Sequence, residues 1–188
     1  LGGASALICT NRLEDYDKAL ATLNNISIED QVYKWYKIKK KAQILSLKKS
    51  ELAAIKFIEK NFLKLKYPNE KVFFDLGNIY KNFKQYRNSI NYYNRALNLV
   101  EKDTTAYADI LYRRGSSYER LGDYENSDLD LLSSLEIVPN DPYVLNYVGY
   151  SWLERDYKVD QAVEMLKSAY EEKKDDPYIT DSLGWAYF

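Results

Sequence analysis

A short pattern near the end of this chain occurs twice at a fixed distance. Asp141-Pro142-Tyr143 is followed by Gly149-Tyr150-Ser151-Trp152, and 35 positions later Asp176-Pro177-Tyr178 is followed by Gly184-Trp185-Ala186-Tyr187. A period of this size is typical of proteins built from stacked copies of one small structural unit. The chain is therefore expected to form a repeat architecture rather than a globule around one central core.

Two series of small residues carry a similar period toward the start of the chain. The first series is Gly77, Gly115, Gly149 and Gly184, and the second is Ala19, Ala54, Ser89, Ser127 and Ala162. Two helices approach closely only where the side chains between them are small. The two series therefore predict antiparallel helix pairs that cross at these positions. Large apolar residues follow the second series by one helical turn, at Ile58, Tyr93, Leu131 and Leu166.

This order of residues resembles the tetratricopeptide repeat, a helix–turn–helix unit of about 34 residues with the order Trp, Leu, Gly, Tyr, Ala, Phe, Pro. The resemblance implies an all-α fold, a right-handed superhelix of antiparallel helix pairs. It departs from the family pattern at Arg114, where a leucine is usual. We expect one helical repeat domain over 1–188, with about five repeats plus a truncated one. The approximate repeats are 1–27, 28–68, 69–102, 103–140, 141–175 and the partial 176–188.

Helix starts and longer turns are also readable from the sequence. Ser50, Asp141 and Asp176 are predicted N-caps, since their side-chain oxygens accept hydrogen bonds from free backbone N–H groups. The helix that begins after Ser50 is expected to continue to Lys66. Extra residues in the repeat spacing predict longer turns near 100–107 and within 155–160.

The ends of the sequence suggest that it is a fragment of a longer chain. Residue 1 is leucine, and the only methionine is Met165. We interpret Leu1 to Cys9 as the end of an incomplete first helix. The last helix is expected to expose Leu183, Gly184 and Tyr187, because no second helix follows it. Uncapped ends of this kind predict possible self-association.

The composition excludes several classes of function. The chain contains no histidine, which removes Ser-His-Asp and Cys-His nucleophile pairs and His-ligated zinc. The single cysteine, Cys9, has no internal disulfide partner, and no glycine-rich phosphate-binding loop is present. No apolar run approaches the roughly 18 residues of a membrane span. We therefore predict a protein that is not an enzyme, with no cofactor and no metal site.

Charge is distributed unevenly along the chain. The stretch from Lys34 to Lys71 contains twelve lysines and three glutamates, whereas Asp123 to Phe188 contains fifteen acidic and five basic residues. We interpret both as solvated helix faces, with steering of an acidic partner to the first stretch as the alternative. Nucleic-acid binding is not expected, because the basic stretch has no arginine and its lysines alternate with core positions.

The candidate binding residues lie on the first helix of each pair. In stacked helix pairs these helices line the concave surface, which is the usual binding site. At 100° per residue, positions −6, −3, +1 and +4 from each glycine form one stripe, which we call the inner stripe. Its candidate partner-binding residues are Phe74, Asn78, Tyr112, Tyr143, Asn146, Tyr150, Tyr178 and Trp185. Aromatic rings are favoured as binding anchors, although packing between repeats is an equally plausible role for them.

The resemblance also bears on the class of partner. Chaperone-binding members of the family hold a terminal carboxylate with Lys, Asn and Arg, but Phe74, Tyr112 and Tyr150 interrupt that set here, so no such clamp is predicted. The residues from Gly149 to Ala186 look like those of bacterial repeat proteins, some of which are envelope lipoproteins that act as adaptors for processing proteases. We predict a scaffold or adaptor that binds a protein or peptide partner in the concave groove.

Two other readings stay open at this point. The chain is either a regulatory or substrate-positioning arm of a larger enzyme or protease complex, or a purely structural oligomerisation module. The bacterial periplasm, the envelope and the cytoplasm all fit the composition.

Overall fold

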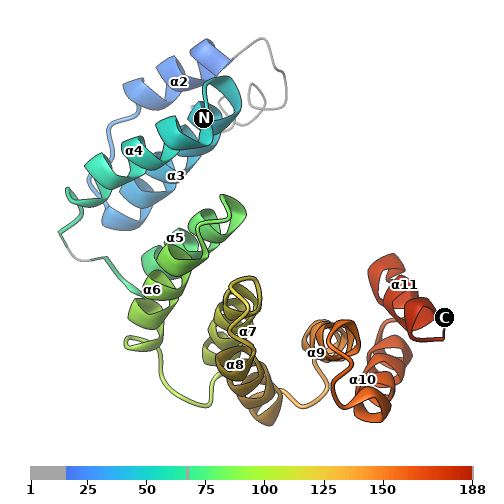
Figure 1. Ribbon diagram of the computed structural model, residues 1–188. Helices are drawn as coiled ribbons and strands as arrows, with labels where there is room; N and C mark the ends of the chain where they lie inside the picture. The colour runs from blue at the N-terminus through green and yellow to red at the C-terminus, as the bar shows by residue number, and fades with distance from the viewer. Residues whose placement is uncertain (1–15, 67, 188) are drawn as a thin grey trace. The chain divides into compact units, whose positions relative to one another are not determined.

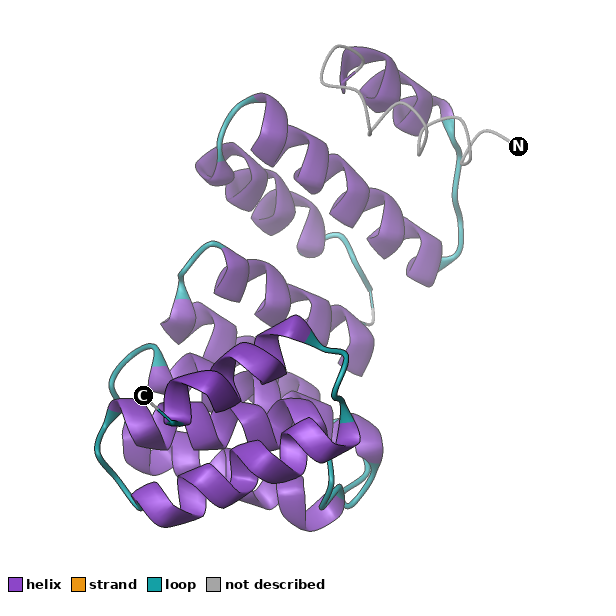
Figure 2. Cartoon of the chain, turned by 90° about the vertical axis from the view of Figure 1, so that its right-hand side faces the viewer, coloured by secondary structure: helices purple, strands orange, loops and turns teal. Residues whose placement is uncertain are grey.

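The computed structural model of this chain describes residues 16–66 and 68–187. The incomplete first helix expected over Leu1 to Cys9 lies outside these residues. Figure 2 shows helices joined by loops, and the described part of the chain contains no strand. The all-α prediction is confirmed.

Helices follow one another with short connections in between, as Figure 1 shows. Their bounds are α2 Tyr16–Asn25, α3 Gln31–Lys48, α4 Glu51–Phe62, α5 Glu70–Asn82, α6 Tyr86–Leu97, α7 Thr105–Glu119, α8 Tyr124–Ile137, α9 Pro142–Glu154, α10 Val159–Glu172 and α11 Pro177–Ala186. The predicted end of α4 at Lys66 is wrong, because the helix already ends at Phe62.

The predicted N-caps act as expected. Ser50 Oγ accepts a hydrogen bond from Ala53 N at 3.2 Å. Asp141 Oδ1 accepts from Tyr143 N at 2.9 Å, and Asp176 Oδ1 accepts from Tyr178 N at 3.0 Å. Each cap is followed by its helix, so the polar residue before the apolar pattern fixes where the helix begins.

Both longer turns occur where the spacing predicted them. The connection between α6 and α7 contains Asp103 in the left-handed region, with φ of 62°. The connection between α9 and α10 contains Asp156 with φ of 51° and Lys158 with φ of 44°. Each insertion therefore lies in a turn and leaves the helices around it in register.

The chain divides into two compact units at the boundary between Pro68 and Asn69. In the first unit, α3 packs against both α2 and α4. The core at the contact of α2 with α3 contains Tyr16, Ala19, Leu23 and Ile44, and all four side chains are buried. The second unit contains the whole of the inner stripe.

In the second unit each helix packs against the next one along the chain, from α5 to α11. The hairpins are α5 with α6, α7 with α8, and α9 with α10, and α11 packs against α10 and α9. One core cluster joins the second and third hairpins through Leu131, Val148 and Trp152. Another joins the third hairpin to α11 through Leu145, Ala169 and Ile179.

Candidate functional site

The glycines of the repeat fix the rotation of each first helix about its own axis. A Cβ atom added at Gly115 would lie 2.9 Å from Cγ of Leu131, and one added at Gly149 would lie 2.8 Å from Cγ of Leu166. Both distances are shorter than a real Cβ contact, so only glycine permits these approaches. Since the glycine side of the helix faces its hairpin partner, the inner stripe lies beside that contact rather than on it.

The part of the stripe on α5 is bound to the second helix of its own hairpin. Asn78 Oδ1 accepts a hydrogen bond of 2.7 Å from the hydroxyl of Tyr93 on α6. The ring of Phe74 lies 6.1 Å from the ring of Tyr93, tilted by 50°. Burial raises the pKa of Tyr93 well above its usual value, so the phenol stays a hydrogen-bond donor.

Tyr112 of α7 packs against α9. Its ring meets the ring of Tyr147 edge to face, with centroids 5.8 Å apart and planes at 79°. The Tyr147 hydroxyl donates a 2.9 Å hydrogen bond to Glu119 Oε2 on α7, and burial raises the pKa of that hydroxyl. Sequence reasoning did not find Tyr147, which lies two positions before Gly149 and so outside the stripe. Tyr112 therefore has a packing role in this structure.

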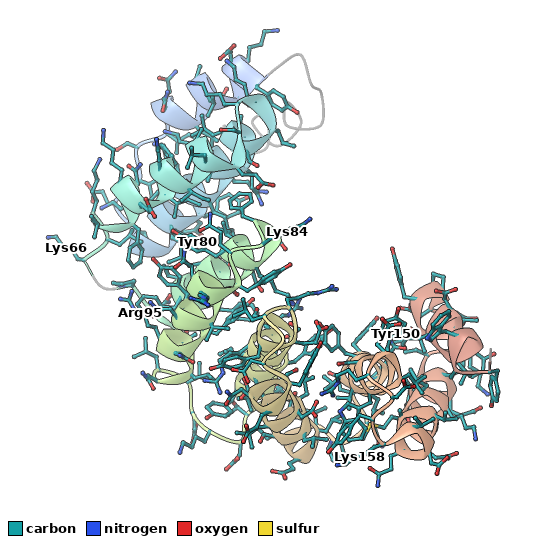
Figure 3. All side chains as sticks on the ribbon, in the orientation of Figure 1. Lys66, Tyr80, Lys84, Arg95, Tyr150 and Lys158 are labelled. Carbon is teal, nitrogen blue, oxygen red and sulfur yellow. The ribbon has the colours of Figure 1, made fainter. Side chains whose placement is uncertain are left out.

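The stripe is more exposed on α9. Tyr143 and Tyr150 keep 47% and 41% of their surface exposed. The ammonium group of Lys173 lies 5.2 Å from the centroid of the Tyr143 ring, a cation–π contact. Between the two tyrosines lies Asn146, whose buried Oδ1 has no hydrogen-bond partner among the described residues. Figure 3 labels Tyr150 on α9 and Lys158 in the connection from α9 to α10.

The last helix carries the most exposed aromatic residues of the stripe. On α11, Tyr178 is 81% exposed and Trp185 is 55% exposed. No heavy atom of the described chain lies within 4 Å of a Cβ added at Gly184, in contrast to the covered glycines of the earlier hairpins. The side of α11 that carries this glycine therefore has no second helix packed on it here.

A group of basic side chains on α5 and α7 was not among the predicted site residues. Lys81 Nζ donates a hydrogen bond to Ser116 Oγ on α7. Burial, together with the charges of Arg113 and Arg120, lowers the pKa of Lys81 to about 8. The sequence signal was present, because Lys81 occupies position +4 of the stripe, but a lone lysine there does not reveal its burial.

Arg114, the departure from the family pattern, has a structural explanation. Its Nε and Nη2 donate hydrogen bonds of 2.7 and 2.6 Å to the two carboxylate oxygens of Asp130 on α8, and its Nη1 donates to Asn94 Oδ1 at 2.6 Å. Asp130 is buried, so a leucine at position 114 would leave its charge unpaired. The pair lines an open cavity of about 610 Å³, whose walls also include the apolar side chains of Leu111, Leu129 and Ile137.

Metal ligation and membrane crossing each require a distinct arrangement of side chains, and neither arrangement occurs in the described residues. No group of three or more His, Cys, Asp or Glu side chains is placed there to hold a metal ion. None of the helices that the structure describes is both long and apolar enough to cross a membrane.

The sequence is similar to one protein family and to a curated protein of known sequence. The family model described as the tetratricopeptide repeat matches residues 70–103 and 108–141. A TPR repeat-containing protein of Pseudomonas aeruginosa is 31% identical over 77 residues, which are 41% of this chain. The match covers 13% of that relative's own length.

Several solved structures share the fold. The chain superposes on BtubC from P. vanneervenii with a TM-score of 0.73 at 14% identity, over 95% of this chain and 83% of that one. It superposes on the APC/C hetero-tetramer Cut9–Hcn1 with a TM-score of 0.71 at 18% identity, over 93% of this chain and 33% of the other. YrrB, described as a TPR protein with an unusual peptide-binding site, gives 0.63 at 18% identity, over 95% and 85%. At these identities the likeness shows the fold alone.

Proposed function

Because this chain is a tetratricopeptide-repeat protein, we propose that it is a non-enzymatic scaffold that holds a segment of a partner protein against its inner stripe. The observation that carries this proposal is the exposure of four large aromatic side chains on two first helices of one unit. They are Tyr143, Tyr150, Tyr178 and Trp185, with 47%, 41%, 81% and 55% of their surface exposed.

Exposed aromatic side chains supply large contact area and lose little conformational entropy on binding. Folding alone gives no reason to leave Tyr143 and Tyr150 of α9 in water, because apolar surface is normally removed from water and α9 already packs against α8, α10 and α11. The peptide-binding site of YrrB supports a peptide as the class of ligand, since its fold is similar.

The test is a pull-down from a native extract of the source organism. One bait is the unchanged chain, and the other replaces Tyr143, Tyr150, Tyr178 and Trp185 by alanine. A control bait replaces Tyr33 and Tyr187, which are 64% and 69% exposed but lie outside the stripe. Far-UV circular dichroism establishes that all three baits fold.

A partner that the unchanged and control baits retain, and that the four-alanine bait loses, supports the proposal. Equal recovery by all three baits contradicts it and directs attention to other surfaces. Recovery that falls as much in the control bait as in the four-alanine bait also contradicts it, because the loss would then reflect general surface hydrophobicity.

A further inference from the structure

The contact between α5 and α7 combines an apolar cavity with an unpaired cation. We call this surface the α5–α7 seam, and it consists of the residues that line the cavity together with Asn78, Lys81, Arg113 and Arg120. A binding role for the α5–α7 seam rests on the proposed function, because the seam would decide which segment of the partner the inner stripe accepts.

The cavity of the seam has a volume of about 220 Å³. Phe74 of α5 and Ile110 of α7 are among its apolar walls, together with Val100 and Ala106. Charged side chains of Glu70, Lys71 and Asp109 complete the lining. A space of this size and character suits one large aliphatic or aromatic side chain from a ligand.

The cation of the seam is Lys81, two helical turns after Phe74 on α5. Asp109 Oδ1 pairs with Arg113 at 3.2 Å, and Glu119 Oε2 pairs with Arg120 at 3.4 Å. Among the residues that the structure describes, no carboxylate forms an ion pair with Lys81, whose ammonium group donates to the neutral Ser116 hydroxyl. The two acids nearby are thus already engaged by arginines, and they compensate the charge of Lys81 only in part.

Asn78 lies between the cavity and Lys81 along α5. Its carbonyl oxygen accepts the hydrogen bond from Tyr93, so the amide NH₂ group is the part of the side chain that is left to donate. An amide NH₂ donates well to a backbone carbonyl. A helical ligand has no free carbonyl in its middle, whereas an extended ligand has one at every residue. Asn78 therefore favours an extended segment.

The spacing fixes the ligand pattern. Seven positions of α5 separate Phe74 from Lys81, which corresponds to about 10.5 Å along the helix axis. A polyproline-type chain rises about 3.1 Å per residue and returns to the same face every three residues. Residues i and i+3 of such a chain lie about 9 Å apart on one side. That separation is close to the rise of about 10.5 Å along α5 between Phe74, which lines the cavity, and Lys81.

We propose that the α5–α7 seam binds an internal, extended, acidic segment of the partner, which places a large apolar side chain in the cavity and the carboxylate of the third residue after it against Lys81. Charge complementarity selects the acidic class, because the seam contains four cationic side chains, Lys71, Lys81, Arg113 and Arg120, and only two carboxylates, Glu70 and Asp109. The chain terminus of the ligand plays no part in this mode, which separates it from recognition of a terminal carboxylate.

The pKa of Lys81 supports the proposal. Burial and the neighbouring guanidinium groups of Arg113 and Arg120 lower it, and Glu119 and Asp109 oppose this effect only in part. A ligand carboxylate against the ammonium group would raise that pKa again. Binding should therefore weaken as the pH rises through about 8, where the free Lys81 loses its proton.

The test uses a defined probe, a fluorescent peptide of sequence Ser-Gly-Leu-Pro-Pro-Glu-Glu-Gly-Ser with both ends blocked, and fluorescence anisotropy. Saturable binding to the whole chain is expected, with at least tenfold weaker affinity for Lys81→Met, since an ion pair is lost. Ala106→Phe, which fills the cavity from an exposed position, is expected to weaken binding similarly. Lys167→Met on α10 is the charge-matched control and should bind as the unchanged chain does.

A second probe with both glutamates replaced by glutamine should lose affinity for the unchanged chain and be indifferent to Lys81→Met. Absence of saturable binding by the first probe, or equal binding to Lys81→Met and the unchanged chain, overturns the seam proposal. The Lys81→Met bait in the pull-down separates the two proposals. If it retains a partner that the four-alanine bait loses, the scaffold proposal stands and the seam proposal falls.

Discussion

Replacement by alanine is expected to change the free energy of unfolding differently at two equivalent glycines, Gly149 and Gly184. A Cβ atom added at Gly149 would lie 2.8 Å from the carbonyl oxygen of Ala162 and 2.8 Å from Cγ of Leu166. The carbonyl belongs to the backbone of α10 and cannot rotate away, so α9 and α10 must separate. At Gly184 the added Cβ atom meets no heavy atom of the described chain within 4 Å.

The magnitudes follow from two terms. Alanine is favoured over glycine inside a helix by about 1 kcal/mol, and at Gly184 nothing opposes this gain. We expect Gly184→Ala to raise the free energy of unfolding by about 0.5–1 kcal/mol, since the position is close to the end of α11. At Gly149, overpacking costs about 1–3 kcal/mol. Gly149→Ala should therefore leave stability unchanged or lower it by about 2 kcal/mol at most, after the helix term is counted.

Urea denaturation followed by far-UV circular dichroism measures both variants. Gly77→Ala serves as a second covered position, because the added atom would meet the ring of Tyr93. If Gly149→Ala and Gly77→Ala stabilise the chain as much as Gly184→Ala does, the glycines are not required for close helix approach. The interpretation that these glycines mark close crossings of the two helices in a hairpin would then be refuted.

Three further predictions concern charges and caps. Asp130→Ala should lower the free energy of unfolding by about 3–5 kcal/mol, because it leaves the partly buried Arg114 without its carboxylate. Replacing both Arg114 and Asp130 by leucine should be close to neutral in the same urea assay. Lys81→Met should raise stability at pH 7 by about 2 kcal/mol. The pKa of Lys81 is about 8 in the folded state and 10.5 in the unfolded state, so the unfolded state binds more protons between these two pH values. The stability of the unchanged chain therefore rises over this range, and the advantage of Lys81→Met fades as the pH approaches 10.5. A series of thermal melts at different pH values measures this change. Asp176→Ala should cost about 1 kcal/mol through loss of the cap of α11, with Asp175→Ala as the neutral control.

The sequence predicts the helices well because their limits have local causes. Asp141 and Asp176 are each followed by a proline. The N-cap and the first turn of α9 and of α11 are therefore determined by four consecutive residues. The end of α4 was placed too late because no glycine or proline interrupts the sequence between Phe62 and Lys66. The chain leaves the helix there without a local sequence signal, so this limit could not be predicted from the sequence.

The inner stripe was less predictable, because a period states which residues share a helix face but not what packs against that face. Phe74, Asn78 and Tyr112 occupy the stripe and nevertheless have intramolecular partners. Tyr143 and Tyr150 occupy the same stripe and stay exposed. The partner of Tyr112 lies on a helix of the next hairpin, which the repeat pattern does not place, whereas Phe74 and Asn78 contact Tyr93 of their own hairpin.

The stripe thus contains two surfaces that would contribute differently to binding. On α5 and α7 the polar groups are held by hydrogen bonds and ion pairs before any ligand arrives, as with Asn78 and Arg113. A surface fixed in this way loses little entropy on binding and selects ligands by charge and spacing. On α9 and α11 the aromatic rings of Tyr150, Tyr178 and Trp185 offer apolar area with few fixed partners. Such area adds affinity with little selection, so a partner that covered both surfaces would owe its specificity to the first and much of its affinity to the second.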